Sequence, residues 1–360
     1  TYVQFARTRK LSLRFSPRTI DIPKISNTNV KAAPIAGVAF FSVNRMNISR
    51  PGIVDILKCF TMDYPYTTIT KPMAVRPIIQ GYDVVYSVVP GITPAVCRQL
   101  HMSIIVPRTD EPLPLIVVYP GGGFKTADWH LYLPMRMALA NAGYVVACAE
   151  YRTIPDTYPA LVVDAKAALR YLRANCDEYN INPDKVGVIG LSAGGYVSNM
   201  VGATIGESMY EEGENLGVST SVDAVATLYG ISDLRNIGDG LGEAVERIHR
   251  SNSSSESLLM NGVAFPGNPP KGILELGTAA VDASPMGHLA TRKPPFLLMA
   301  GDKDEIVSPV QSHQWYDALR MAGNEAKLIM LKDAGHENDP CWAQDAINDI
   351  LISWFDRQLK

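Results

Sequence analysis

Beyond Tyr82, short apolar segments alternate with longer segments of helical character. Strands that alternate with helices form βαβ units, whose parallel strands share one sheet covered by helices on both faces. We therefore predict an α/β fold with a mainly parallel central sheet and an antiparallel hairpin at its edge. The expected strands lie at 84–89, 100–106, 115–119, 144–150, 186–191, 223–228, 296–300 and 326–331. The expected helices lie at 133–142, 160–175, 193–203, 312–322 and 342–359.

Two parts of the chain depart from this alternation. Residues 1–80 form a basic, proline-containing extension, and residues 81–360 form the expected catalytic domain. The extension could be a lid, an edge of the sheet or a contact in a homo-oligomer, and these roles stay open. Within the domain, residues 232–283 read as an irregular insertion with one possible helix at 241–250, as expected for a lid or a surface loop.

Composition and charge exclude several classes of partner. Apolar residues make up 47% of the chain, which is enough for a sizeable core. A net charge of −3 provides no positive field to attract a phosphate backbone, so we expect no nucleic acid partner. The apolar runs are much shorter than the roughly 20 residues of a membrane-spanning helix, so we expect no membrane span.

The five cysteines are scattered and lack the spacing of metal ligands, so we predict no metal site. Their number leaves one over if they pair, which favours free thiols in a reducing compartment and hence the cytoplasm. The chain starts at Thr1 rather than Met. A secreted or periplasmic location with a removed leader therefore stays open.

The sequence Gly190-Leu191-Ser192-Ala193-Gly194 follows an apolar strand and precedes a helix-forming run. This is the setting of a nucleophile elbow, in which a strained serine stands on a tight strand-to-helix turn and its neighbours are glycines. A serine at this place can also cap the following helix. Because other motifs of a hydrolase accompany it, we predict that Ser192 is a nucleophile.

The segment Pro120-Gly121-Gly122-Gly123-Phe124 directly follows the strand at 115–119. A hydrolase places here the loop whose backbone N–H groups bind an oxyanion. We assign the donors to Gly122, Gly123 and the N–H of Ala193. The alternatives are a flexible loop or a phosphate cradle, but no Lys-Ser/Thr signature follows the glycines.

A serine nucleophile needs a histidine as base and a carboxylate that orients the histidine. Of six histidines, His336 lies between the last expected strand and the terminal helix, and we predict it as the base. The carboxylate follows the strand at 296–300, where Asp302 and Asp304 compete. We prefer Asp304, because Asp302 is typical of a turn. The order Ser192, Asp304, His336 is that of α/β-hydrolases.

From about Tyr82 to Lys360 the chain resembles the bacterial feruloyl-esterase-like and acetylxylan-esterase-like branch of α/β-hydrolases, which is distantly related to the hormone-sensitive-lipase group. The resemblance rests on Tyr119 to Phe124, Glu150-Tyr151-Arg152, Gly190 to Gly195, Ala283-Ser284-Pro285, Pro294-Pro295-Phe296, Gly301 to Val307 and Ala334-Gly335-His336. In this pattern the acid stands three positions after the glycine, at Asp304. One departure is Pro120, where many relatives carry His, and it changes how the glycine loop is braced. Glu150-Tyr151-Arg152 is expected to support that loop from beneath.

The resemblance implies an α/β-hydrolase fold and a serine carboxylesterase that works through an acyl-enzyme without a cofactor. Its implied substrates are small-molecule or carbohydrate esters with small acyl, acetyl or hydroxycinnamoyl groups. A peptidase of the prolyl-oligopeptidase type and a non-catalytic binding protein are the alternatives. Four aromatic residues near the expected catalytic loops are candidates to line a substrate pocket, with core packing as the alternative: Phe124, Trp129, Tyr196 and Trp342.

Overall fold

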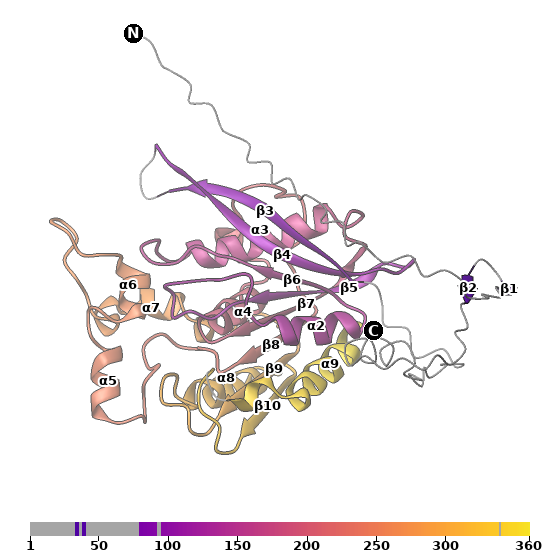
Figure 1. The fold of residues 1–360 in the computed structure, drawn as a ribbon. Helices are drawn as coiled ribbons and strands as arrows, with labels where there is room; N and C mark the ends of the chain where they lie inside the picture. The colour runs from indigo at the N-terminus through magenta and orange to yellow at the C-terminus, as the bar shows by residue number, and fades with distance from the viewer. Residues whose placement is uncertain (1–32, 36–37, 41–78, 92–94, 338–339) are drawn as a thin grey trace, which may run out of the picture. The chain divides into compact units, whose positions relative to one another are not determined.

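The computed structural model describes residues 33–35, 38–40, 79–91, 95–337 and 340–360 (Figure 1). The structure divides the chain into two units, residues 1–72 and residues 73–360. In the first unit, the described residues are one antiparallel pair of strands, β1 (Ala33–Ile35) and β2 (Val38–Phe40). Most of the extension expected at residues 1–80 lies outside the described residues.

The second unit is built on an eight-stranded sheet with the order β10-β9-β8-β7-β5-β6-β4-β3. Neighbouring strands from β10 to β6 are parallel, whereas β4 pairs antiparallel with β6 and with β3. The mainly parallel sheet and its edge hairpin are therefore as predicted. The strands are β3 (Ile79–Pro90), β4 (Cys97–Pro107), β5 (Leu113–Tyr119), β6 (Val145–Ala149), β7 (Ile181–Leu191), β8 (Ala224–Leu228), β9 (Phe296–Gly301) and β10 (Ala326–Leu331).

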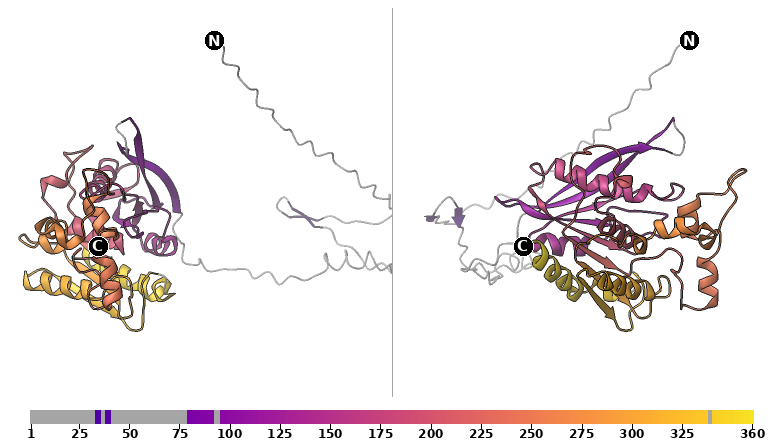
Figure 2. Two further views of the ribbon diagram at one scale, coloured as in Figure 1. Left: turned by 90° about the vertical axis from the view of Figure 1, so that its left-hand side faces the viewer. Right: turned by 180° about the vertical axis from the view of Figure 1, so that it is seen from behind.

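Helices cover both faces of this sheet, as Figures 1 and 2 show. The side chains of β5 alternate between two cores: Leu115, Val117 and Tyr119 belong to one, and Ile116 and Val118 to the other. The first core packs against α3, α4 and α8, and the second against α2 and α9. Their bounds are α2 (Leu133–Asn141), α3 (Ala160–Ala174), α4 (Ala193–Ala203), α8 (Val310–Met321) and α9 (Asp345–Leu359).

The insertion is more regular than the sequence predicts. Between residues 232 and 283 the structure contains α5 (Glu243–His249), α6 (Ser255–Asn261), α7 (Thr278–Asp282) and the 3-10 turn η2 (Ile273–Leu276). The serine-rich run interpreted as loop holds the start of α6, because the Ser254 side chain accepts a hydrogen bond from the Ser257 N–H and caps the helix. Three further 3-10 turns are η1 (Ser208–Tyr210), η3 (Pro285–Gly287) and η4 (Pro340–Ala343).

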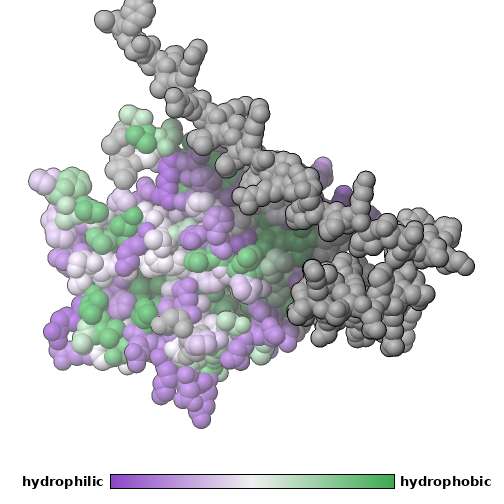
Figure 3. Space-filling model, in the orientation of Figure 1, coloured by the Kyte–Doolittle hydropathy of each residue, from purple (hydrophilic) through white to green (hydrophobic). Residues whose placement is uncertain are grey.

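The surface of the second unit mixes hydrophilic and hydrophobic residues on the face that Figure 3 presents. Among the residues that the structure describes, no helix combines the length and the apolar character needed to cross a bilayer. Within the same residues, no group of three or more His, Cys, Asp or Glu side chains converges to hold a metal ion.

Candidate active site

Ser192 stands at the turn between β7 and α4, with a backbone conformation of φ 54° and ψ −119°. An L-residue rarely adopts a positive φ, so the surrounding fold must enforce this conformation. The two flanking glycines explain how: a Cβ on Gly190 would lie 2.0 Å from the Gly194 carbonyl oxygen, and a Cβ on Gly194 would lie 2.0 Å from the Tyr119 carbonyl oxygen. The turn therefore closes only with glycine on both sides of the serine.

The structure brings together the three side chains that the sequence singles out for acyl transfer. Ser192 Oγ lies 2.9 Å from His336 Nε2, and His336 Nδ1 lies 2.6 Å from Asp304 Oδ2. Ser192 follows β7, Asp304 follows β9 and His336 follows β10. All three therefore meet at the carboxyl edge of the parallel strands, where open α/β sheets bind their ligands.

The carboxylate of Asp304 is fixed by the loop that carries it. Its Oδ1 atom accepts hydrogen bonds from the N–H groups of Ile306 and Val307, each 2.9 Å long. Oδ2 is left to accept a hydrogen bond from the N–H group at Nδ1 of His336. This tautomer leaves a lone pair on Nε2, facing the hydroxyl of Ser192.

The competing carboxylate has a different place. Asp302 is exposed, and its Oδ1 atom accepts the N–H of Asp333 at 2.6 Å. That contact ties together two loops at the rim and gives Asp302 the turn role expected of it. The hydrogen bond to His336 belongs to Asp304.

The glycine loop after β5 has a backbone that only glycine adopts with ease. Gly122 has φ 145° and Gly123 has φ 58°, and a Cβ on Gly122 would lie 2.2 Å from the Thr126 carbonyl oxygen. In the described part of the chain, no acceptor engages the N–H groups of Gly122 and Gly123. The N–H of Ala193 begins α4 and has no acceptor within the helix. These three N–H groups, assigned from the sequence, remain available as donors.

Tyr151 supports the glycine loop from beneath. Its hydroxyl donates a 2.6 Å hydrogen bond to the carbonyl oxygen of Pro120, and both residues are buried. Further along, the N–H of Ile154 donates to the carbonyl oxygen of Phe124 at 2.9 Å. The segment after β6 therefore holds the loop at both of its ends, Pro120 and Phe124, and Tyr151 gives the support expected of residues 150–152.

The four aromatic residues expected near the site take different places. Phe124 and Tyr196 are fully buried in the core beneath the loop, with ring centroids 5.4 Å apart and an edge-to-face contact. Trp129 stacks on His101 with centroids 4.8 Å apart and donates to the Asp83 carboxylate. None of these three residues belongs to the wall of the apolar pocket described below. Trp342 lines an apolar pocket.

This apolar pocket has a volume of about 180 Å³, and its wall includes Leu191 and Glu337, the sequence neighbours of Ser192 and His336. The ring of Tyr229 lies between the pocket and the base, with its centroid 4.7 Å from that of His336 and 4.7 Å from that of Trp342. Glu337 is the one charged residue in the lining. The pocket is lined by Tyr132, Pro134, Met135, Leu191, Leu228, Tyr229, Glu337, Trp342 and Ala343.

Sequence reasoning missed Tyr132, Tyr229 and Glu337. Two of them carry a signal in hindsight: Tyr229 directly follows β8, and Glu337 directly follows His336, so both stand at the carboxyl edge of the sheet. Tyr132 lies at the start of α2 and has no such signal.

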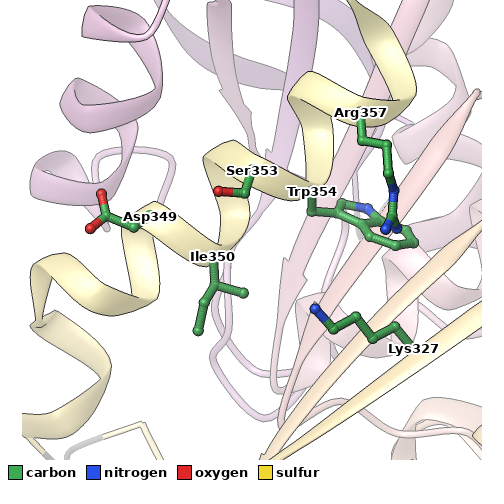
Figure 4. A pocket seen from close by; sticks show the side chains of 6 residues that line it. All are labelled: Lys327, Asp349, Ile350, Ser353, Trp354 and Arg357. Atoms are coloured by element: carbon green, nitrogen blue, oxygen red, sulfur yellow. The ribbon is translucent and has the colours of Figure 1, made fainter.

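A second hollow, of about 330 Å³, lies between α9 and β10 (Figure 4). Lys327 is the second residue of β10, so this hollow faces the amino end of the strand, whereas the catalytic loops leave the carboxyl ends. Its lining residues are Lys327, Asp349, Ile350, Ser353, Trp354 and Arg357. It is therefore separate from the site around Ser192.

Comparison with curated proteins finds named ester hydrolases. LipM of Mycobacterium tuberculosis, a probable carboxylic ester hydrolase, is 25% identical over 59% of this chain and 46% of its own length. Esterase LipC of the same organism is 25% identical over 83% of this chain and 76% of its own length. The chain thus spans about half of LipM and about three quarters of LipC.

Comparison with solved structures confirms the α/β-hydrolase fold. A truncated carbohydrate esterase from gut microbiota has a TM-score of 0.66 and 22% sequence identity, covering 80% of this chain and 98% of its own. The sequence model of the BD-FAE family matches residues 102–319, which is more than half of the chain and includes Ser192 and Asp304. The expected resemblance to α/β-hydrolase esterases is confirmed, and the matched domain is of the ester-hydrolase class. The chain belongs to the BD-FAE family.

Proposed function

We propose that this protein is a serine carboxylesterase in which Ser192, His336 and Asp304 form the catalytic triad. The observation that carries the proposal is the unbroken chain of two hydrogen bonds, 2.9 Å and 2.6 Å long, that links Ser192 Oγ through the His336 imidazole to Asp304. The enforced backbone of Ser192 and the unengaged N–H groups of the glycine loop support the same role. A protein that only binds its ligand has no need of this combination of features.

Ser192 Oγ attacks the ester carbonyl while Nε2 of His336 takes the hydroxyl proton. The Asp304 carboxylate stabilises the imidazolium that forms. The tetrahedral oxyanion is bound by the backbone N–H groups of Gly122, Gly123 and Ala193, each of which contributes about 3 kcal/mol to transition-state binding. The imidazolium returns its proton to the leaving alcohol, and an acyl-enzyme remains on Ser192. A water molecule, deprotonated by His336, then attacks the acyl carbonyl, and the acid leaves as the bond to Ser192 Oγ breaks and His336 returns the proton to Oγ.

We propose small-molecule or carbohydrate esters as substrates, with acetyl, other small acyl or hydroxycinnamoyl groups. The apolar pocket of about 180 Å³, whose wall includes Leu191 before Ser192 and Glu337 after His336, supports this range, because its aromatic and aliphatic walls suit a short aliphatic chain or a single ring. The solved relative named as a carbohydrate esterase supports a sugar on the alcohol side.

The catalytic domain comprises residues 81–360 in this proposal, and residues 1–80 are an extension to it. The scattered cysteines of the sequence support the cytoplasm as the compartment.

The test is hydrolysis of p-nitrophenyl esters, from acetate to octanoate, by the wild-type protein and by Ser192→Ala. The proposal expects turnover by the wild type that falls to background in the variant, with short chains preferred because the pocket is small. Aminoacyl p-nitroanilides serve as the peptidase arm of the same assay. Turnover of the anilides without turnover of the esters would replace the esterase by the peptidase alternative.

A further inference from the structure

One hydroxyl group connects the two loops that the proposed mechanism depends on. Tyr132 Oη accepts the N–H of Gly121 at 3.2 Å and donates to Glu337 Oε1 at 2.7 Å. Gly121 is the first glycine of the glycine loop after β5, which is the oxyanion loop of the proposed mechanism, and Glu337 is the residue after His336. We call the two hydrogen bonds that run from Gly121 through Tyr132 to Glu337 the bridge. The residues on either side of this hydroxyl are 216 positions apart in the sequence, so the fold alone brings them together.

The protonation of the bridge is fixed by its partners. A tyrosine hydroxyl has one proton, and a carboxylate can only accept, so that proton points to Glu337 while the Gly121 N–H donates to the oxygen. Burial, together with the nearby Tyr229 and Glu337, raises the pKa of Tyr132 well above its usual value. The hydroxyl therefore stays protonated, and can donate its hydrogen bond, over the pH range in which an esterase works.

The packing around Gly121 leaves this bridge little room to shift. A Cβ on Gly121 would lie 3.0 Å from Glu337 Oε2, 3.0 Å from Tyr132 Oη and 3.1 Å from the Leu191 carbonyl oxygen. The oxyanion loop is thus in close contact with the Tyr132–Glu337 pair and with the residue before Ser192.

Tyr132 is itself anchored to the sheet. It has φ 57° at the start of α2, a conformation that the neighbouring chain must hold in place. Buried Arg136 does so, because its guanidinium donates to the carbonyl oxygens of Trp129 and Leu131 and to the hydroxyl and carbonyl oxygens of Ser103 on β4. Arg136 therefore holds the backbone that carries Tyr132 against β4.

We infer that Tyr132 and Glu337 are positioning residues for ester hydrolysis: together they hold the oxyanion loop in register with the loop that carries His336. The inference rests on the proposed function. Tyr132 sets the place of Gly121 and hence the direction of the donors at Gly122 and Gly123. Glu337 orients the Tyr132 hydroxyl. The His336 imidazole is already faced by the Asp304 carboxylate and by the neutral Tyr229 ring, and Glu337, as the next residue in the chain, adds a second negative charge that favours the imidazolium formed during the reaction.

The experiment compares Tyr132→Phe and Glu337→Gln with the wild type, and Tyr144→Phe serves as the matched control. Tyr144→Phe also removes a tyrosine hydroxyl bonded to a carboxylate, that of Asp356, but this pair joins the residue before β6 to α9, away from Ser192. We measure kcat and KM for p-nitrophenyl acetate across pH, and thermal unfolding reports on the fold of each variant.

Tyr132→Phe is expected to lower kcat about tenfold with KM within about twofold, a fraction of the 10²- to 10³-fold loss that removing an oxyanion donor causes. Glu337→Gln is expected to move the acid limb of kcat/KM to lower pH, because the base loses a neighbouring negative charge. Tyr144→Phe is expected to keep both the wild-type kcat and the wild-type pH profile. A purely structural bridge would lower the unfolding temperature without moving the pH profile.

An active wild type with unchanged kcat in Tyr132→Phe and an unchanged acid limb in Glu337→Gln would overturn the inference and leave the proposed esterase intact. A wild type without esterase activity would overturn both. If Tyr132→Phe folds poorly, the pH profile of Glu337→Gln decides the question by itself.

Discussion

Replacing Asp304 by Asn tests whether this carboxylate sets the tautomer of the base. Oδ1 of Asp304 accepts two backbone N–H groups, so the amide oxygen of asparagine must take that position. The amide NH₂ group then faces His336 Nδ1, which can no longer donate and must accept. The imidazole proton moves to Nε2, and the hydroxyl of Ser192 loses its base.

The expected loss follows from this geometry. An inverted tautomer removes general-base catalysis but keeps the oxyanion donors, so kcat should fall by roughly 10³- to 10⁴-fold, or about 4 to 5.5 kcal/mol of transition-state stabilisation. Both backbone hydrogen bonds to the side chain persist, so the unfolding temperature should stay close to that of the wild type.

The assay is steady-state hydrolysis of p-nitrophenyl acetate, and Asp302→Asn is the matched control. Asp302 lies two residues away, carries the same charge and has no hydrogen bond to His336 among the described contacts. It should retain activity within a few-fold of the wild type. Comparable losses in the two variants, or an Asp304→Asn variant within tenfold of the wild type, would refute the tautomer argument.

Three further outcomes follow from single contacts. Tyr151→Phe removes the donor to the buried Pro120 carbonyl oxygen and should cost roughly 1 to 3 kcal/mol of stability, measured by urea unfolding, together with a fall in kcat. The hydrogen bond to Glu256 raises the pKa of His249 above 6.5, so its stabilising contribution is complete below pH 6.5 and is lost as pH rises through the raised pKa. Melting temperatures from pH 6 to 9 should show this decline in the wild type and a weaker one in His249→Gln. Met135→Ala enlarges the apolar pocket, so the preferred p-nitrophenyl ester should become longer, and an unchanged chain-length profile would place the acyl group elsewhere.

The sequence was informative where chemistry depends on the local backbone. The glycines around Ser192 and at Gly122 are dictated by turns that directly follow apolar strands, so motif and position could be read together. Asp304 and His336 also follow strands. Because parallel strands place their carboxyl ends at one edge, four distant segments could be expected to meet there.

The rest depended on tertiary contacts that no local pattern encodes. Phe124 follows the glycine loop in sequence, but its φ of 62° goes with a fully buried side chain in the core. Tyr132 and Glu337 meet across 205 positions. The insertion helices α5, α6 and α7 have five to seven residues, too few to be stable alone, so their formation depends on packing and caps that propensity does not report.

The most direct test of the central claim is covalent labelling of Ser192. The protein is treated with a fluorophosphonate that phosphonylates activated serines, and intact mass and peptide mapping locate the adduct. Our account predicts one adduct per chain on Ser192, none in Ser192→Ala, and much slower labelling in Asp304→Asn. An unlabelled wild type, or an adduct on another serine, would contradict the assignment of Ser192 as the nucleophile.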